Sequence, residues 1–370
     1  MTLHNGPENT KPDNSGRFDV DVAFALNLMA SGVSGLTASA ATPGQSARIV
    51  PIMTQNMDEG TGFGPILAAG SFPALLSAVT AMYLEVQASN VPERSAAVAR
   101  QIGAQQPTLV ALQEVSLWRT GQFLAPPATN VAFDQLQSLL DALNQQGLHY
   151  AAICIQTELD AEAPCSLGFD VRVTDRNVVL ARTDLPVSQF RVLAIHMQDY
   201  VAELTVPTLV GLVTVPRGWI AIDVKIRGTS YRFITTHLEA ASAAIQEAQG
   251  SELLQGPANT TLPLVIAGDL NSAASGGPDT TATYNNLTNS GFQDAWALVS
   301  TDPGFTWPLH GEDPFTATST PSERIDLVLV RNGVTVSGAA RVGNTSADRT
   351  ASGLWPSDHA GVVATLLMPN

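Results

Sequence analysis

The sequence contains few positive charges. Two of its 370 residues are lysine, Lys11 and Lys225, and the formal net charge is −15. Proteins that hold nucleic acid through its phosphate backbone normally present a basic face. This composition leaves room for a local arginine patch at most. It therefore disfavours high-affinity, non-specific binding of nucleic acid, although a bound metal ion would offset part of the negative charge locally.

Cysteine and long apolar runs are also scarce. The two cysteines, Cys154 and Cys165, are too few for a disulfide framework or a zinc site, and they allow either one bridge or two free thiols. No apolar run reaches the roughly 18 residues that a transmembrane helix needs. Charged residues make up 14% of the chain and hydrophobic residues 45%, which excludes global disorder and provides for a substantial core.

The N-terminal 46 residues differ from the rest of the chain. Residues 1–21 are polar, residues 22–36 are mostly small and apolar, and residues 38–40 read Ala-Ser-Ala. An apolar stretch before such a triplet is typical of a secretion signal, although the acidic flank here replaces the expected basic one. We expect a secreted protein, with a cytoplasmic protein that carries a flexible extension as the alternative. Residues 47–370 read as one domain.

The clearest strand is residues 264–267, an apolar run between Pro263 and Gly268. Such a run is typical of a strand buried on both faces of an α/β sheet. It delivers Asp269 and Asn271, which point to the same side if the extended geometry persists. A local turn closed by Asp and Asn is the simpler alternative. Further strands are expected at 48–56, 108–114, 150–157, 177–181, 187–195, 219–226, 231–236, 323–330 and 361–367, and helices at 73–86, 92–105, 132–146 and 241–254.

Polar residues of catalytic type stand at or beside the ends of these strands: Asn56, Glu114, His237, Asp269, Asn271, Asp358 and His359, with Asp326 inside one. Strand ends of α/β proteins are where ligand sites form. Taken singly, Glu114 is equally suited to cap a helix, each histidine to close a turn, and Asp326 to pair with Arg324. Seven such coincidences in one chain favour a shared site.

The motifs that carry these residues resemble, in their order, those of the endonuclease/exonuclease/phosphatase superfamily with the DNase I-like fold. They read Thr-Gln-Asn-Met, Leu-Gln-Glu-Val, Thr-His-Leu-Glu, Gly-Asp-Leu-Asn-Ser, Arg-Ile-Asp-Leu-Val-Leu and Pro-Ser-Asp-His, and they span residues 48–368. The resemblance implies a four-layer α/β sandwich, with two mixed β-sheets packed face to face and helices outside. The long gap between the first two motifs, and Arg217-Gly-Trp219 with the alternating strand that follows it, resemble a bacterial, often exported branch.

The resemblance implies a metal site. Glu114 matches the principal metal ligand of the superfamily, with Asn56 and Asp358 completing or supporting the site. Hard oxygen ligands of this kind suit Mg²⁺ or Mn²⁺ better than zinc.

The resemblance also assigns catalytic roles. His359 matches the catalytic histidine and Asp326 the carboxylate that orients it. Asp269 matches the residue that aligns or deprotonates the attacking water. Asn271 and His237 match residues that contact the scissile phosphate. Sequence leaves open how His359 and Asp269 divide the acid and base work.

Two residues of the segment 170–182 are expected to contact the substrate phosphate, Asn177 and the neighbouring Arg176. Arg172 and Arg182 extend this segment into a patch of arginines, for which a solvated loop with scattered charge is the alternative. The residues 206–215 form the one candidate for an apolar hairpin that docks on a membrane, and we expect them to be a core strand instead.

The function that follows is divalent-metal-dependent hydrolysis of a phosphate ester, most simply by a monomeric phosphodiesterase. The substrate classes left open are nucleic acid, phospholipid and small phosphate esters. A phosphomonoesterase of the same fold is the first alternative. A non-catalytic binding protein is the second, but such a protein should have lost Glu114, Asp269 or His359, and all three are present.

Overall fold

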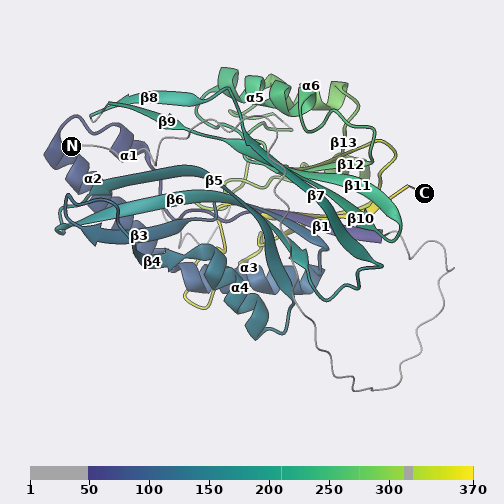
Figure 1. Cartoon of the computed structure of the whole chain (residues 1–370), viewed down its shortest axis with the longest axis horizontal. Helices are drawn as coiled ribbons and strands as arrows, with labels where there is room; N and C mark the ends of the chain where they lie inside the picture. The colour runs from purple at the N-terminus through teal and green to yellow at the C-terminus, as the bar shows by residue number, and fades with distance from the viewer. Residues whose placement is uncertain (1–48, 210, 275, 312–319, 370) are drawn as a thin grey trace.

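The computed structural model describes residues 49–369 except 210, 275 and 312–319 (Figure 1). The apolar stretch 22–36 and the triplet 38–40 therefore lie outside the described residues. Within the described ranges, the chain forms two large β-sheets, one small hairpin and a set of helices.

The first sheet has eight strands in the order β15-β16-β1-β2-β6-β3-β4, with β5 paired to β6. Within it, β1 runs antiparallel to β16 and parallel to β2. The strands are β1 (Ile49–Asn56), β2 (Leu109–Gln113), β3 (Leu117–Gln122), β4 (Asn130–Asp134), β5 (Tyr150–Pro164), β6 (Phe169–Arg182), β15 (Thr335–Val342) and β16 (Gly361–Leu367).

The second sheet has six strands in the order β13-β14-β12-β11-β10-β7. Here β11 and β12 are parallel, and β14 runs antiparallel to β12. The strands are β7 (Phe190–Asp199), β10 (Gly218–Ile226), β11 (Thr229–Thr236), β12 (Leu264–Asp269), β13 (Gln293–Asp294) and β14 (Asp326–Arg331).

Alternating side chains hold the layers together, because successive residues of a strand point to opposite faces. In β1, Ile52 packs into the core between the two sheets, while Met53 faces the helices α3 (Val91–Gln105) and α4 (Gln135–Gln145). In β12, Val265 faces the shared core and Ile266 packs into the outer cluster of the second sheet. Both strands are apolar on two faces because each is buried on two faces.

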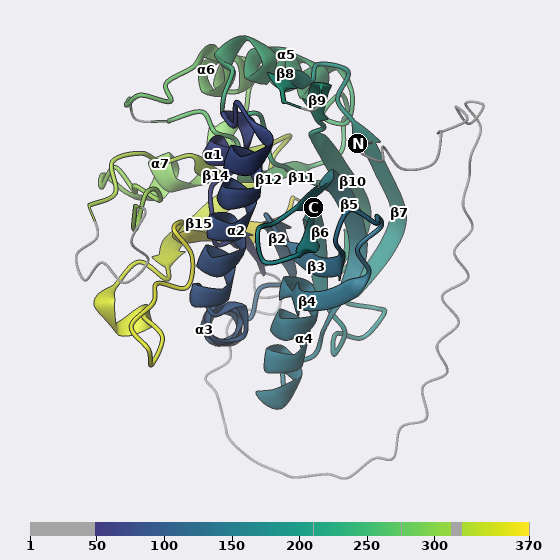
Figure 2. The same cartoon turned by 90° about the vertical axis from the view of Figure 1, so that its left-hand side faces the viewer.

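The helices therefore form the outer layers. Figure 1 shows α3 and α4 below the first sheet, and α5 (Ala243–Gln255) and α6 (Ala282–Asn289) above the second. This is the four-layer α/β sandwich that the sequence predicts. Figures 1 and 2 place α1 (Gly64–Leu67) and α2 (Phe72–Ala88) at one end of the sandwich, and the short α7 (Ala295–Val299) lies near β15 (Figure 2).

Three segments differ from the expected elements. The hairpin of β5 and β6 is much longer than 150–157 and 177–181, so the arginines of 170–182 stand on a strand, not on a loop. The helix expected at 132–146 begins at Gln135, because residues 130–134 form β4 and Asp134 caps the helix. The expectation of a core strand at 206–215 is wrong: β8 (Leu204–Thr208) and β9 (Gly211–Val215) form a separate two-stranded hairpin in which Leu212 is 76% exposed.

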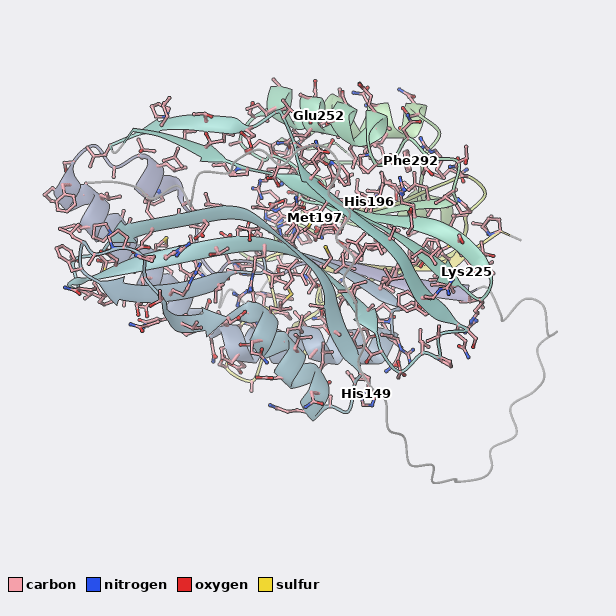
Figure 3. All side chains as sticks on the ribbon, viewed as in Figure 1. His149, His196, Met197, Lys225, Glu252 and Phe292 are labelled. Atoms are coloured by element: carbon pink, nitrogen blue, oxygen red, sulfur yellow. The ribbon has the colours of Figure 1, made fainter. Side chains whose placement is uncertain are left out.

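Three further features concern the described part of the chain. Cys154 and Cys165 are both buried free thiols. No helix there is long and apolar enough to cross a membrane. Lys225, the one lysine in that part, lies near the end of β10, as the right-hand side of Figure 3 shows.

Candidate active site

The topology brings the polar strand ends to one edge of the sandwich. Parallel strands end side by side, and an antiparallel neighbour begins where they end. In the first sheet β1 and β2 end at Asn56 and Gln113. The antiparallel strand β16 begins beside the end of β1. In the second sheet Asp269 pairs with Asp326, and His237 forms an isolated bridge with Asp269. Residues from six separate segments therefore converge. We call them the convergent group: Asn56, Glu114, His237, Asp269, Asp326, Asp358 and His359.

His359 and Asp326 form the tightest pair of the site. Nδ1 of His359 lies 2.8 Å from Oδ2 of Asp326, and both side chains are buried. Burial alone would lower the pKa of His359, but the carboxylates of Asp326 and Asp358 outweigh it and raise that pKa well above the usual value. The ring is therefore held as an imidazolium. Trp307 packs at a tilt beside it, with 6.3 Å between the ring centres.

The backbone around His359 is anchored to the end of β1. Oγ of Ser357 donates to the carbonyl of Asn56 over 2.7 Å and accepts from the amide of His359 over 3.0 Å. The side chain of Gln55 donates to the carbonyl of His359 over 3.1 Å. These bonds fix the loop that carries Asp358 and His359 against the first sheet.

Glu114 and Asp358 are the accessible carboxylates of the site. Their side chains are 24% and 26% exposed, whereas those of Asp269 and Asp326 are 1% and 0% exposed. Burial, together with the negative charge of Asp358, raises the pKa of Glu114 to about 8. Burial also raises the pKa of Asp358. Two partly exposed carboxylates that repel one another are the oxygen donor set that Mg²⁺ or Mn²⁺ takes, so these residues fit a divalent ion.

Asn56 links this carboxylate pair to the buried one. Its Nδ2 donates to Oε1 of Glu114 over 2.9 Å and to Oδ2 of Asp269 over 3.0 Å. Its Oδ1 accepts from the amide of Asp58 over 2.9 Å. Asn56 thus presents its amide nitrogen to the site and orients two carboxylates. The loop that follows is held by the buried Arg94, which pairs with Asp58 at 2.9 Å.

Asp269 lies at the centre of the group. Its Oδ2 is 3.7 Å from Nε2 of His237 and 3.8 Å from Nδ1 of His359. Burial and the charge of Asp326 raise the pKa of Asp269 to about 6, which leaves it mostly ionised at neutral pH. Glycine is required just before it, because a Cβ on Gly268 would lie 2.2 Å from the carbonyl oxygen of Thr236.

Asn271 turns the chain beside Asp269. It adopts a left-handed backbone conformation, with φ of 46°, and its amide donates to Oδ1 of Asp269 over 2.9 Å. Its Nδ2 donates to the carbonyl of Leu238 over 2.9 Å. The Asx-type turn weighed from sequence is therefore present. It fixes Asp269 within the convergent group.

His237 faces both halves of the site. Its Nε2 lies 3.8 Å from Oε1 of Glu114, and its Nδ1 lies 2.8 Å from Nη1 of Arg217. Burial, and then the positive charge of Arg217, lower the pKa of His237 well below its usual value. The two histidines of the site are therefore held in opposite charge states at neutral pH.

Asn177 and Arg176 point in opposite directions, as neighbours on a strand must. Asn177 is fully buried, and its Nδ2 donates to Glu158, a carboxylate that lies next to His237. Arg176 instead donates to the carbonyls of Val115 and Ser116. Its guanidinium holds the turn that follows Glu114, so Arg176 does not join the convergent group.

The arginines of residues 170–182 do not form the expected patch of free positive charge. Each of them has a carboxylate partner within the described residues. Arg172 pairs with Asp160, Arg176 with Asp134 and Arg182 with Asp184. The alternative of scattered, partnered charge is the one that the structure supports.

Sequence reasoning missed Glu158, Asp175 and Arg217, which surround Nδ1 of His237. Asp175 had a usable signal, because it stands two residues before Asn177 on the same face of β6. Glu158 had none. Arg217 stood out only in Arg217-Gly-Trp219, which marks a resemblance to a branch of the family and not a place beside His237.

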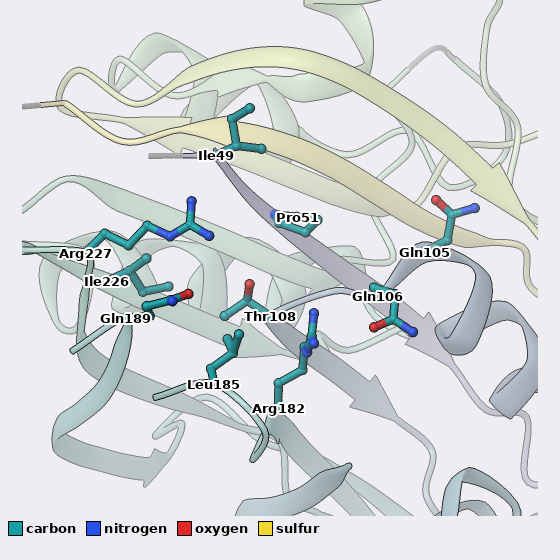
Figure 4. Close-up of a pocket in the computed structure, with 10 residues that line it drawn as sticks. All are labelled: Ile49, Pro51, Gln105, Gln106, Thr108, Arg182, Leu185, Gln189, Ile226 and Arg227. Atoms are coloured by element: carbon teal, nitrogen blue, oxygen red, sulfur yellow. The ribbon is translucent and has the colours of Figure 1, made fainter. Parts of the chain in front are cut away.

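A cavity of about 290 Å³ lies elsewhere. Figure 4 shows its lining of Ile49, Pro51 and Thr108 with glutamine and arginine side chains. Ile49 begins β1 and Asn56 ends it, so this cavity and the convergent group lie at opposite ends of β1. It contains none of the residues described above.

Comparison with known proteins gives one family and a shared fold. A model of the endonuclease/exonuclease/phosphatase family matches residues 53–359. No curated protein matches the sequence. A solved structure of an endonuclease/exonuclease/phosphatase family protein from Leptotrichia buccalis is similar at 17% identity and a TM-score of 0.54, over 86% of this chain and 99% of that chain.

Two further solved structures are similar at 16% identity. The mannosyl-6-phosphatase of Bacteroides thetaiotaomicron has a TM-score of 0.52, over 86% of this chain and 100% of that chain. TDP2 of D. rerio, complexed with a single-strand DNA product, has a TM-score of 0.50, over 86% of this chain and 98% of that chain. At these identities the likeness establishes the fold.

Proposed function

The chain belongs to the endonuclease/exonuclease/phosphatase family, a family of metal-dependent phosphoric ester hydrolases, and we propose that it is a phosphodiesterase that uses Mg²⁺ or Mn²⁺. The observation that carries the proposal is the convergence of a charged His359–Asp326 pair, an ionised Asp269 and the partly exposed carboxylates of Glu114 and Asp358. Hydrolysis of a phosphate ester needs an aligned water, charge stabilisation on the phosphoryl oxygens and a stabilised leaving oxygen.

Each residue then has a role suited to its charge. Glu114 and Asp358 would hold the ion, with Asn56 orienting Glu114. A bound Mg²⁺ or Mn²⁺ supplies Lewis-acid polarisation of a phosphoryl oxygen. Asp269, the ionised acceptor, would align the attacking water and take its proton.

The remaining residues supply hydrogen bonds to the phosphate. His359, held protonated by Asp326, would donate to a phosphoryl oxygen that gains charge. His237 and Asn271 lie beside Asp269 and would contact the same phosphate. Asn177 is bound to Glu158, so its contribution would be to hold that carboxylate behind His237.

The first test is hydrolysis of bis-(p-nitrophenyl) phosphate beside p-nitrophenyl phosphate, with Mn²⁺ or Mg²⁺ and then with EDTA. We expect EDTA-sensitive cleavage of the diester that falls at least about a hundredfold in Asp269→Ala. Asp223→Asn serves as the matched control, because Asp223 pairs with Arg232 on the same sheet, outside the convergent group. Cleavage of the monoester alone would instead make the protein a phosphomonoesterase.

One observation favours phospholipid among the diester substrates. The β8–β9 hairpin projects from the sandwich with Leu212 76% and Leu209 45% exposed, and it contacts α1, which follows the end of β1 (Figure 1). Exposed apolar side chains on a projecting hairpin suit a lipid surface. Phospholipid vesicles and single-stranded DNA are therefore the two natural substrates to compare, and faster cleavage of DNA would count against this preference.

Metal binding should release a proton. Because the pKa of Glu114 is raised to about 8 in the metal-free protein, this carboxyl is largely protonated at pH 7, and an ion displaces the proton. We expect affinity for Mn²⁺ to rise from pH 6 to about pH 8 and then level off. Calorimetry at pH 7 in two buffers of different ionisation enthalpy measures the released proton, and Glu114→Gln should abolish the release. A proton count of zero for the wild-type protein would contradict the assignment of Glu114 as a ligand.

A further inference from the structure

A second cluster of charged side chains lies behind His237, and none of its members contacts the substrate in the scheme above. Glu158 comes from β5, Asp175 from β6, and Arg217 precedes β10. Their side chains are 1%, 6% and 13% exposed. One ligand atom each from Glu158, Asp175 and His237 lie within 4.8 Å of one another, which is the composition and spacing of a metal site.

Arg217 occupies the centre of this cluster. Its Nη1 lies 2.8 Å from Oε2 of Glu158, 2.8 Å from Nδ1 of His237 and 3.6 Å from Oδ2 of Asp175. One nitrogen therefore reaches every group that would otherwise bind a cation. The guanidinium of Arg217 thus occupies the position that a bound cation would take.

The cluster is built to hold the arginine. Glu158 accepts a second hydrogen bond from Nδ2 of Asn177 and a third from the amide of Gly218 over 3.2 Å. Glycine is needed at 218, because a Cβ there would lie 2.1 Å from the side chain of Gln156. Oδ1 of Asp175 is buried and has no hydrogen-bond partner among the described residues. Removal of Arg217 would therefore leave a buried carboxylate pair that attracts cations.

The contact between Arg217 and His237 also fixes the tautomer of the ring. A guanidinium has donors and no acceptor. A separation of 2.8 Å from Nη1 is a hydrogen bond only if Nδ1 of His237 offers its lone pair. The ring proton is then on Nε2, the atom that faces Glu114 and Asp269 at 3.8 and 3.7 Å.

We propose that Arg217 is a positioning residue: it replaces a second cation between Glu158, Asp175 and His237, and it fixes His237 with its proton on Nε2. His237 is thereby a preformed hydrogen-bond donor aimed at the convergent group. The identity of its acceptor, a phosphoryl oxygen of the substrate, rests on the proposed function. The tautomer and the displaced cation do not.

The tautomer can be measured directly in the metal-free wild-type protein. Long-range ¹H–¹⁵N correlation spectra at pH 7.5 resolve the two ring nitrogens of each histidine, and the spectrum of His237→Gln identifies the His237 signals. We expect a protonated Nε2 and an unprotonated Nδ1. A proton on Nδ1 would overturn the proposal without the use of any Arg217 variant.

Two Arg217 variants extend the test. Arg217→Met removes the donors while keeping the apolar stem, and Arg217→Lys keeps a cation that can only donate. We expect Arg217→Met to move the His237 proton to Nδ1, which faces Glu158 at 3.8 Å, and Arg217→Lys to retain it on Nε2. An unchanged spectrum in a folded Arg217→Met protein would contradict the positioning role.

The number of bound Mn²⁺ ions tests the second part of the proposal, that Arg217 replaces a cation. Titration with Mn²⁺ alone, followed by electron paramagnetic resonance of the free ion, should find one more bound ion in Arg217→Met than in the wild type, and no extra ion in Arg217→Lys. Arg232→Met is the matched control, since it also breaks an arginine–carboxylate pair, at 2.7 Å to Asp223, and should bind no extra ion. Equal counts in wild type and a folded Arg217→Met would refute the replacement of a cation.

Hydrolysis separates this inference from the proposed function. With a diester substrate, Arg217→Met should lower kcat about ten- to a hundredfold with a smaller change in KM, and Arg217→Lys should recover part of the loss. If the wild-type protein cleaved no phosphate ester, the proposed function would fail. The ring spectra and the Mn²⁺ counts would still decide the role of Arg217.

Discussion

Glutamine in place of Glu114 is expected to reduce kcat/KM for a diester by about a thousandfold or more. The substitution keeps the shape of the side chain and removes the negative charge that this partly exposed carboxylate offers to a divalent ion. The bond from Nδ2 of Asn56 to Oε1 can persist, because a glutamine oxygen also accepts it. The loss of activity would therefore result from the missing charge and not from a disrupted hydrogen bond to Asn56. Steady-state kinetics over a range of Mn²⁺ concentrations measures it, and excess Mn²⁺ should not restore the rate.

Stability provides the control for this variant. The pKa of Glu114 in the folded protein, about 8, lies above its ordinary value of 4.5. The folded state therefore holds a proton that the unfolded state has lost between these pH values, and stability falls as pH rises through that window. Glutamine cannot ionise, so metal-free Glu114→Gln should melt at or above the wild-type temperature at pH 8. Glu85→Gln, on the exposed face of α2, is the matched substitution and should leave activity unchanged. A fully active Glu114→Gln enzyme would remove Glu114 from the metal site.

Asparagine in place of Asp326 is the second change with a large expected effect. The carboxylate accepts from Nδ1 of His359 over 2.8 Å and keeps the ring protonated. Without it the pKa of His359 falls, because burial then acts with less opposition. We expect kcat to drop about a hundred- to a thousandfold at pH 8. The alkaline side of the pH–rate profile should also move to lower pH, since the active imidazolium is lost earlier.

The displacement of the profile distinguishes this role from a general loss of structure. His359→Gln should lower the rate at least as far, and it should remove the ionisation of His359 from the profile altogether. Asp223→Asn, on the same sheet, should change neither the rate nor the profile. An Asp326→Asn enzyme whose reduced rate follows the wild-type pH dependence would show that Asp326 does not set the charge of His359.

The sequence predicts the fold and the convergent group because both depend on local patterns. Each apolar run is a strand, and each polar end is marked by a residue pair or a motif, as at Gly268 and Asp269. Once parallel and antiparallel neighbours are arranged, the ends must meet. Asp326 and His359 are 33 residues apart and still touch, because one begins β14 and the other precedes β16.

What the sequence does not predict depends on direction and on distant packing. Arg176 looks like a phosphate ligand from its neighbours, but strand alternation turns it away from Asn177. The residues 206–215 are as apolar as a core strand, and nothing local shows that they project as a hairpin. The sequence around Arg217 does not show its role, because that role exists only where β5, β6 and β10 come together around His237.

The pairing of β1 with β16 has a consequence for the order in which the protein is made. The strand at the start of the described structure is hydrogen-bonded along its length to the strand near its end, from Ile49 opposite Leu367 to Thr54 opposite Val362. The first sheet therefore cannot be completed during synthesis until β16 has left the ribosome. Contacts of such long sequence separation form late. Asp358 and His359 arrive immediately before that strand. Translation that stops short of it leaves a chain with no assembled catalytic group.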